Sequence, residues 1–378
     1  MANETSTWLA LAREIGPELA KHAAAHDADG SFAVEAYRLF AERKIFSMAV
    51  PKELGGGGAS FVEVCETLRE LATFDASAAL SLSMHTHLIA ATVWKHKHGK
   101  PGEALLRKVA AAELALVSTG ASDWIDSNGE MKRVPGGYRV TARKIFGSGS
   151  PAAAMMLASA RYDDPEAGAQ VLHFPVPLSA EGVTVTNDWD AHGMRATGSH
   201  TILLKDVFVP DAAISVRRPA GKWDASWSVV LTVAPPLYMA PYVGIAEKAA
   251  ELAYGAARDR ADVPYVALLA GETEVELAAA RTAWRAMIAR ANEYDFAPAL
   301  ETANAQLVHK TLCARAAIAT VDKAAELAGG RGFFRSFGLE RLMRDVRAAA
   351  NHPLQEKRQH ELSGRIALGR DPISNARV

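Results

Sequence analysis

Residues 329–359 read GGRGFFRSFGLERLMRDVRAAANHPLQEKRQ and decide the fold of this chain. The stretch begins where a long alanine-rich helical pattern stops at Gly329 and Gly330. Such a glycine-rich turn lets the backbone approach a ligand closely, and its exposed amides can hold a pyrophosphate. The same glycines are equally typical of a helix C-cap followed by a turn. Farther along, the sequence carries Arg-Asp at 344–345 and Asn-His-Pro at 351–353.

The remainder of the chain divides into helical, β and helical parts. Apolar residues recur at helical spacing over 1–112 and again beyond 226. Between 113 and 215, short β-prone segments are separated by Gly, Pro, Asn and Asp, as in a small β-sandwich or β-barrel. We therefore predict an α+β fold with a helical domain over 1–112, a central β domain over 113–225 and a helical bundle over 226–378.

The composition excludes several classes of function. Hydrophobic residues make up 49% of the 378 residues and charged residues 22%, as in an ordinary globular protein. Lys and Arg (42) nearly balance Asp and Glu (43) without a basic stripe, so we expect no nucleic-acid partner. The amino terminus lacks a secretory pattern, and no apolar run approaches the roughly 20 residues of a membrane span. Cys65 and Cys313 have no CxxC spacing, which is typical of a reducing compartment, and we predict a cytoplasmic protein without a membrane association.

Three segments resemble the acyl-CoA dehydrogenase superfamily, and their order makes the likeness more specific than any one of them. Residues 49–80 place the glycine-rich turn PKELGGGG before a helix, which Ser60 and Glu63 open with a capping-box pattern. Residues 189–214 run from a Gly-Met-Arg turn into a strand that ends in Val-Pro, and residues 325–349 contain the loop and helix quoted above. The likeness extends over essentially the whole chain. It implies an acyl-CoA dehydrogenase-like fold, with a helical amino-terminal domain, a central β-barrel or sandwich and a carboxy-terminal four-helix bundle.

The resemblance also implies a bound flavin nucleotide and the residues that contact it. At the isoalloxazine ring these are Phe146 and Ser148 and, in the shortened LVSTGASD loop, Ser118 and Thr119. Taken without the resemblance, Phe146 is a core strand residue and Ser148 a turn former. The implied contacts on the nucleotide side are Arg258, Gly329, Gly330 and Gly332.

The residues implied for the nucleotide side also indicate which flavin binds and whether the chain forms an oligomer. In the family the glycine-rich loop contacts the flavin of a neighbouring subunit, which implies a homo-oligomer, a dimer or tetramer. The family's Phe-Gly pair beside the adenine is replaced by Ala261-Asp262. We therefore predict FAD and keep FMN open. A lone Arg258 on a helix is otherwise a solvated surface residue.

The catalytic carboxylate of an acyl-CoA dehydrogenase is missing from both places where the family carries it. Such an enzyme needs a base to remove the α-proton while hydride leaves for flavin. The position after the Arg-Asp pair falls at Pro353, and the alternative helix position falls within LTVAPP at 231–236. Glu356, three residues from Pro353, is the remaining candidate base, although a surface glutamate is the simpler interpretation.

A histidine stands beside Pro353 instead, as in the branch of the superfamily that resembles flavin-dependent monooxygenases. In that branch reduced flavin activates oxygen, and His and Ser side chains hydrogen-bond to the activated oxygen. The matching residues are His352, Ser148 and one of His85 and His87, which point to different faces of a helix. Imidazole suits this task because it donates or accepts a proton near neutral pH. His352 is otherwise a helix-ending residue before proline. We predict no metal site.

Three hypotheses follow from these residues. The first is a monooxygenase that acts on a small organic substrate and receives reduced flavin from a separate reductase. The second is an acyl-CoA dehydrogenase with its own electron-transfer partner. The third is a flavin-binding protein without catalytic activity.

Overall fold

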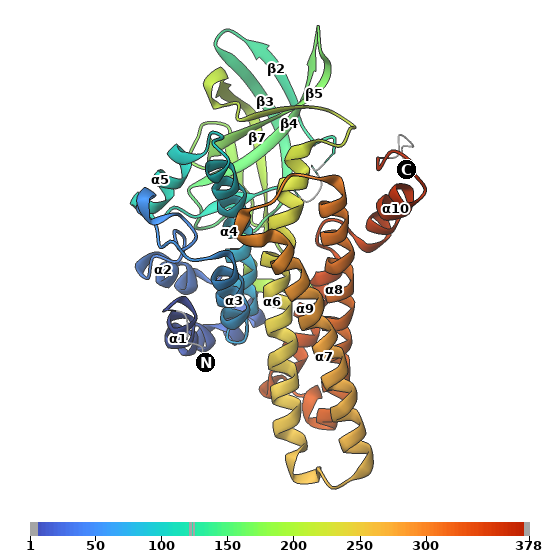
Figure 1. Ribbon diagram of the computed structural model, residues 1–378. Helices are drawn as coiled ribbons and strands as arrows, with labels where there is room; N and C mark the ends of the chain where they lie inside the picture. The colour runs from blue at the N-terminus through green and yellow to red at the C-terminus, as the bar shows by residue number, and fades with distance from the viewer. Residues whose placement is uncertain (1–6, 121–122, 124, 374–378) are drawn as a thin grey trace.

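The computed structural model describes residues 7–373 apart from 121, 122 and 124. Figure 1 shows helices beside a sheet and a long helical bundle that extends away from that sheet. The amino-terminal helices are α1 (Thr7–Asp29), α2 (Val34–Glu42), α3 (Phe61–Ala72), α4 (Ala76–Lys97) and α5 (Glu103–Ala112). The carboxy-terminal helices are α6 (Ala225–Ala257), α7 (Pro264–Ala291), α8 (Leu300–Ala328), α9 (Leu339–Val346) and α10 (Glu356–Ala367). The predicted α+β class, with helices on both sides of a β region, is confirmed.

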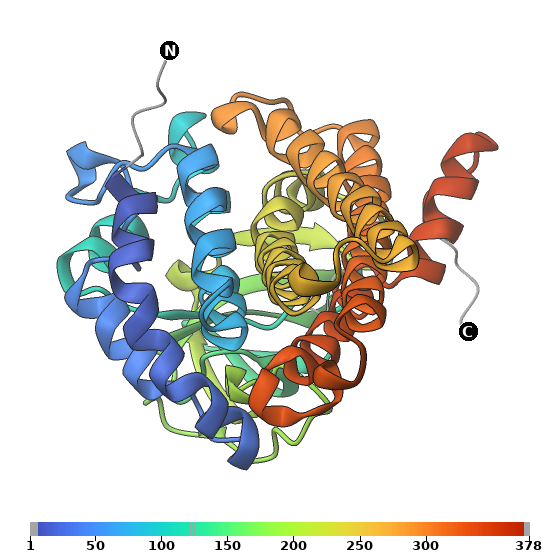
Figure 2. The same ribbon diagram turned by 90° about the horizontal axis from the view of Figure 1, so that it is seen from below.

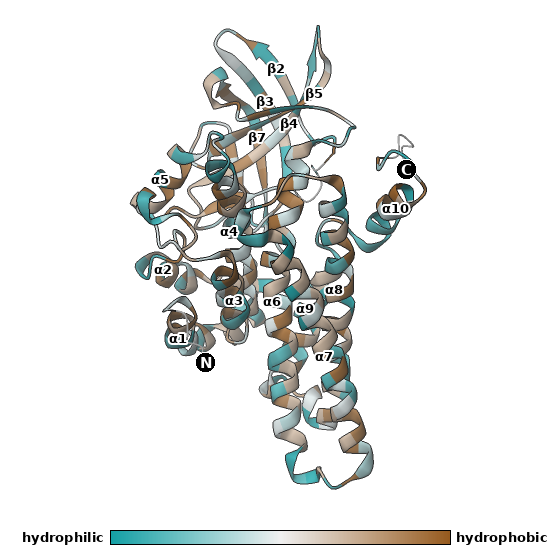
Figure 3. Ribbon diagram, in the orientation of Figure 1, coloured by the Kyte–Doolittle hydropathy of each residue, from teal (hydrophilic) through white to brown (hydrophobic). Residues whose placement is uncertain are grey.

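The β region is one curled sheet. Its strands are β1 (Leu116–Ser118), β2 (Glu130–Val134), β3 (Gly137–Gly147), β4 (Met155–Asp164), β5 (Gly168–Pro177), β6 (Val183–Val185), β7 (His200–Pro210) and β8 (Val216–Pro219). Within the described part of the chain they form an eight-stranded sheet in the order β6-β7-β3-β2-β4-β5-β8, with β1 parallel to β4. Val140, Met156, Phe174 and Val209 from four strands pack in one buried cluster, so the sheet encloses a core of its own. Figure 3 shows the hydrophobic residues along β4 and β7.

The capping-box prediction for α3 is confirmed. The Ser60 hydroxyl accepts from the Glu63 amide at 3.2 Å, and the Glu63 carboxylate accepts from the Ser60 amide at 2.8 Å. The next helix, α4, begins in the same manner, because the Asp75 carboxylate accepts from the Ala78 amide at 3.0 Å. These short side chains satisfy amides that the first helical turn leaves free. They fix where α4 begins and therefore where its histidines lie.

Helix α6 lies at the centre of the molecule. It packs against α3 and α4 on one side and against α7 and α8 on the other. By length and composition it is apolar enough to cross a membrane, but 94% of its most apolar stretch is buried inside the protein. Its hydrophobicity is therefore that of a core helix.

Side chains from α7 and α8 donate hydrogen bonds to backbone carbonyls of α6. Helix α6 contains three prolines, each of which leaves a carbonyl one turn earlier without its amide donor. Pro236 does this to the carbonyl of Thr232, which accepts from the Gln306 amide of α8 at 2.8 Å; that amide also donates to Met287 O of α7 at 3.0 Å. The Trp284 indole of α7 donates to Pro236 O at 2.8 Å. The three long helices are thus joined by polar contacts inside an apolar bundle.

The Gly-Met-Arg turn of the β region is joined to α9 and α1. The Met194 amide donates to the buried carboxylate of Asp345 on α9, and the Arg344 guanidinium binds both oxygens of Asp27 on α1, at 2.9 and 2.6 Å. At Gly193 a Cβ atom would lie 2.4 Å from the carbonyl oxygen of Arg344. Figure 2 shows the blue end of α1 next to this red-orange part of the chain. Three segments that are distant in sequence therefore meet at one point.

We predict that Gly193→Ala destabilises the protein by about 1–3 kcal/mol, because the methyl group must push the turn away from the α9 backbone. The matched control is Gly255→Ala within α6, where a Cβ atom meets nothing within 4 Å. That change should raise stability by about 0.5–1 kcal/mol through helix propensity. Calorimetric melting temperatures test both, and equal shifts for the two variants would contradict the close approach.

Candidate functional site

His352 lies in the segment between α9 and α10 and is held against α6. Its Nε2 atom is 2.7 Å from the hydroxyl of Tyr242. Its ring stacks on that of Tyr238, which lies one turn before Tyr242 on α6; the centroids are 4.8 Å apart and the interplanar angle is 12°. The spacing of four residues puts both tyrosines on one face of α6. Two aromatic side chains of one helix therefore fix the position and orientation of the imidazole.

The backbone around His352 is also held. The Tyr238 hydroxyl donates to Pro353 O at 2.8 Å, and the Lys310 ammonium of α8 donates to His352 O at 2.9 Å and to Leu354 O at 3.1 Å. Burial lowers the pKa of Lys310 to about 8. Burial, and then the nearby charges of Lys310 and His87, lowers the pKa of His352 to about 3. The imidazole is therefore neutral at physiological pH.

The two histidines of α4 have different surroundings. Both ring nitrogens of His85 form hydrogen bonds with backbone groups. Nε2 pairs with Phe46 O at 2.8 Å, and Nδ1 accepts from the Leu116 amide at 3.0 Å. His87 is 8% exposed; the Ser83 backbone lies near its ring, but its Nδ1 forms no hydrogen bond of normal geometry with a described residue. Burial lowers the pKa of each to about 4, and His87 is close enough to His352 to affect its pKa. The arrangement assigns a structural role to His85 and leaves His87 as the candidate for the site.

Ser148 belongs to a chain of hydroxyl groups at the end of β3. Its Oγ is 2.8 Å from Ser199 Oγ, which is 2.7 Å from Thr197 Oγ1, and Thr197 donates to Met194 O at 3.0 Å. The Met194 amide in turn contacts Asp345. Burial, and then the charge of Asp345, raises the pKa of Tyr242, so this carboxylate lies near the phenol. Hydrogen bonds thus lead from Ser148 through Thr197 and Met194 to Asp345, whose charge acts on the tyrosine that holds His352.

Phe146 is an exposed aromatic residue. Its ring is 49% exposed, its φ is +59°, and it faces Trp189 edge-on with centroids 6.1 Å apart. The interpretation of Phe146 as a core residue is therefore wrong. Ser118 ends β1 half-buried, and Thr119 is buried. Next to this pair, residues 121 and 122 of the LVSTGASD loop lie outside the described part of the chain.

The end of α6, which Arg258 follows, lies at the far end of the bundle from the sheet (Figure 1). Arg258 is exposed at the end of α6, and Gly329 and Gly330 are exposed at the end of α8. The two ends are adjacent, because the Arg260 guanidinium donates to Leu327 O at 3.3 Å. Gly332 is buried there. Arg258 and the glycines come together, but not beside His352 of the same chain.

Comparison with known proteins agrees with this architecture. Residues 7–113 match the family model for the acyl-CoA dehydrogenase N-terminal domain, and residues 237–356 match that for the C-terminal domain. The chain is 30% identical to L-evernosamine nitrososynthase of a Micromonospora species, over 88% of this chain and 82% of that protein. The chain belongs to the acyl-CoA dehydrogenase superfamily.

Two further relatives specify the branch. A probable FMNH2-dependent monooxygenase, SfnC of Pseudomonas putida, is 26% identical over 94% of this chain and 93% of its own. The crystal structure of KijD3 in complex with FMN and an amino sugar nucleotide superposes with a TM-score of 0.87 at 26% identity, covering 98% of this chain and 96% of that one. The chain is thus a flavin-dependent oxidoreductase whose relatives include nitrososynthases and monooxygenases, and the predicted resemblance is confirmed.

The two carboxylates nearest in sequence to the place of the superfamily's catalytic base, Glu356 and Asp345, are bound to other groups of the protein. Both oxygens of Glu356 bind the Arg315 guanidinium, at 3.0 and 2.7 Å, and this contact lowers the pKa of Glu356. Burial raises the pKa of Asp345 to about 7, but that side chain is 2% exposed and bound to the Met194 amide. Neither group is placed to remove a substrate proton. The arrangement agrees with the sequence, which has Pro353 where the superfamily's base would stand.

Sequence reasoning missed Tyr238, Tyr242 and Lys310. A signal was present, because PLYMAPYVG (236–244) places two polar aromatic residues four apart on an otherwise apolar helix. Buried tyrosine hydroxyls need hydrogen-bond partners, so such a pair indicates a polar contact inside the core. Lys310 gives a similar signal as a lysine in an alanine-rich buried helix.

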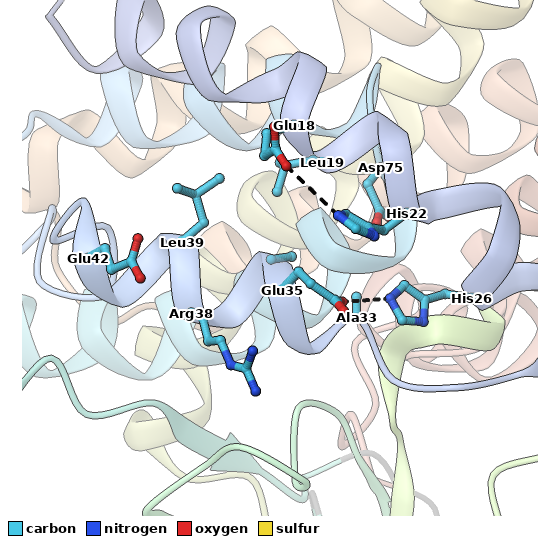
Figure 4. A pocket seen from close by; sticks show the side chains of 11 residues that line it. Glu18, Leu19, His22, His26, Ala33, Glu35, Arg38, Leu39, Glu42 and Asp75 are labelled. Atoms are coloured by element: carbon cyan, nitrogen blue, oxygen red, sulfur yellow. Dashed lines mark hydrogen bonds and ion pairs between the residues drawn. The ribbon is translucent and has the colours of Figure 1, made fainter.

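A separate surface pocket of about 190 Å³ lies between α1 and α2 (Figure 4). His26 faces Glu35 there at 2.8 Å, and His22 lies 3.9 Å from Glu18. None of the flavin-site residues predicted from the sequence lines this pocket. It is therefore distinct from the His352 site.

We predict that His85→Ala destabilises the protein more than His87→Ala. The first change strands the carbonyl of Phe46 and the amide of Leu116, at a cost of about 1–3 kcal/mol for each unsatisfied group. The second removes a ring nitrogen that has no partner among the described residues. Urea midpoints test the order, and a larger loss in His87→Ala would reassign the structural role.

Proposed function

We propose that this protein is a two-component monooxygenase that uses reduced FMN from a separate reductase to oxygenate a small organic substrate. The observation that carries the proposal is the neutral imidazole of His352, fixed by Tyr242 near His87, whose Nδ1 has no partner within the described ranges. Reduced flavin supplies the two electrons with which one oxygen atom of O2 enters the substrate and the other leaves as water. This chemistry needs hydrogen-bonding groups at the flavin edge and no carboxylate base.

The side chains present suit a flavin ring. The exposed face of Phe146, beside Trp189, offers an apolar surface for a planar heterocycle. The hydroxyl of Ser148 and the imidazoles of His87 and His352 are the polar groups available to the ring edge. In the proposed reaction these three groups hold activated oxygen by hydrogen bonds and exclude bulk water from it. A neutral imidazole can donate one hydrogen bond without adding positive charge.

FMN is proposed in preference to FAD. Ala261-Asp262 stands where the superfamily's Phe-Gly pair helps to bind the adenine, so the adenine side of FAD loses a contact. The KijD3 complex contains FMN, and SfnC is described as FMNH2-dependent. Fluorescence titration with FMN and with FAD distinguishes the two cofactors.

The reaction itself is tested by supplying FMN, NADH and a flavin reductase in air with amine and sulfur substrates. We expect oxygenated product from the wild type. In His352→Gln, product formation should fall about 100-fold while hydrogen peroxide release rises, because the group that holds activated oxygen is lost. The control is Glu356→Gln, which changes a carboxylate paired with Arg315 outside the site and should leave product formation unchanged.

Two results would overturn this proposal. Anaerobic bleaching of bound flavin by an acyl-CoA, abolished in Glu356→Gln, would show a dehydrogenase. Failure to bind flavin, with no product from any substrate, would support a protein without catalytic activity.

The same proposal includes a homo-oligomer, a dimer or tetramer. Arg258 and the glycine-rich loop are exposed far from His352, and Phe333 and Phe334 next to them are 89% and 65% exposed. A second subunit would cover these apolar rings and bring Arg258 to the flavin phosphate of its neighbour.

We predict that Arg258→Ala raises the dissociation constant for FMN about 10-fold without changing the mass of the assembly. Arg107→Ala, which removes an exposed arginine paired with Glu103 on α5, is the control and should have no effect. Titration and light scattering measure the two quantities. A monomeric protein whose affinity for FMN is unchanged by Arg258→Ala would refute both the contact and the assembly.

A further inference from the structure

Tyr242 has one hydrogen-bond partner among the described residues, the Nε2 atom of His352 at 2.7 Å. The tyrosine is fully buried in α6, so no surface water competes for its hydroxyl. The hydrogen bond of the His352 ring is at Nε2, and the residue is only partly buried; Nδ1 on the other side of the ring is without a partner among the described residues. The imidazole therefore has one nitrogen committed to the protein and one left for a ligand.

The protonation states of this pair follow from burial. Burial raises the pKa of Tyr242 well above its usual value, and the charge of Asp345 adds to the effect, so the phenol keeps its proton. Burial lowers the pKa of His352, so the ring is neutral and carries a single N–H. One proton of the pair therefore lies on the phenol oxygen and one on a ring nitrogen.

Only one arrangement of these two protons satisfies both groups. If the ring carried its proton on Nε2, that N–H would donate to the phenol, and the phenol proton would need another acceptor. The Asp345 carboxylate lies near the phenol but accepts from the Met194 amide, and no described residue accepts from the Tyr242 hydroxyl other than His352. An unpaired buried donor costs about 1–3 kcal/mol. If the phenol donates to Nε2, the ring proton must reside on Nδ1, where a ligand can accept it.

We propose that Tyr242 is a positioning residue that fixes His352 as the Nδ1–H tautomer, so that the ring offers a hydrogen-bond donor to the ligand. This inference rests on the proposed function for its chemical consequence. A donor at Nδ1 holds an oxygen atom by an N–H···O bond, whereas a lone pair at the same place would repel it. Tyr242 would thus set the chemical character of the site without touching the substrate.

Other residues hold the His352 ring in position, so the effect of Tyr242 on its tautomer can be separated from support of the ring. Tyr238 stacks on the imidazole, and Lys310 holds the carbonyls of His352 and Leu354, so the ring keeps its place when the phenol oxygen is removed. Tyr242→Phe should therefore change the tautomer more than the position. Tyr238→Phe removes a hydroxyl that bonds to Pro353 O and leaves the bond from Tyr242 intact.

The direct test is nitrogen NMR of the flavin-free protein labelled with [15N]histidine. The chain has 12 histidines, and the His352 signals are those missing from His352→Gln. We expect the Nδ1–H tautomer in the wild type and in Tyr238→Phe, and a substantial Nε2–H population in Tyr242→Phe. A wild-type protein in the Nε2–H form would overturn the inference, and so would a tautomer unchanged by Tyr242→Phe. Because only His352→Gln is needed to assign the signals, the wild-type spectrum decides the matter even if Tyr242→Phe does not fold.

The kinetic test separates tautomer control from loss of structure. In Tyr242→Phe we expect about 10-fold lower kcat for product with unchanged KM, and more hydrogen peroxide released per FMNH2 consumed. Tyr294→Phe removes another buried hydroxyl, one without a hydrogen-bond partner in the described part of the chain, and should match the wild type. Equal kcat values in Tyr242→Phe and Tyr294→Phe would overturn the inference. If the tautomer is as expected but the wild type oxygenates nothing, the proposed function fails and the tautomer assignment stands.

Discussion

The contact between the Gly-Met-Arg turn and α9 is the constraint on which the rest of the structure depends. Gly193 approaches the Arg344 carbonyl so closely that no side chain fits, and Asp345 is buried against the Met194 amide. The turn leads to the hydroxyl chain of Ser148, whereas α9 leads to the segment that carries His352. A shift at this junction would therefore move two parts of the candidate site relative to each other. The ion pair between Arg344 and Asp27 connects the same point to the amino-terminal helices.

The candidate site combines a firmly held histidine, His352, with a second histidine, His87, whose Nδ1 has no hydrogen-bond partner among the described residues. His352 is fixed by stacking on Tyr238, by Tyr242 and through its backbone by Lys310. His87 is buried with a ring nitrogen that has no partner in the described structure. Unpaired buried polar atoms are costly, and each needs its own explanation. At His87 the proposed explanation is a bound ligand, whereas the unpaired hydroxyl of Tyr294 lies outside the candidate site.

The sequence predicted the order of the elements well, because helical and strand periods differ and the change of period is clear near both ends of the β region. It also led to His352, since Asn-His-Pro replaces the expected carboxylate segment. It did not distinguish His85 from His87, because their difference lies in the contacts of His85 with Phe46 and Leu116, which are distant in sequence. Phe146 was similarly ambiguous, because the same residue type suits a core and a ligand surface. Tyr242 and Lys310 were missed because their partner, the His352 segment, lies 110 and 42 residues away.

The prolines of α6 also bear on the order in which the chain acquires its structure during synthesis. The carbonyl of Thr232 lacks its donor within the helix and takes one from Gln306, which emerges from the ribosome 74 residues later. Until α8 has been made, this carbonyl lacks its protein donor, and the side of α6 that α8 covers has only α7 as a neighbour. The helices α3 and α4 pack on the other side of α6, so the helix that completes their core is made before α8. The polar contacts that join the three long helices are therefore completed only after α8 has been made, whereas the core of the sheet consists of residues made earlier.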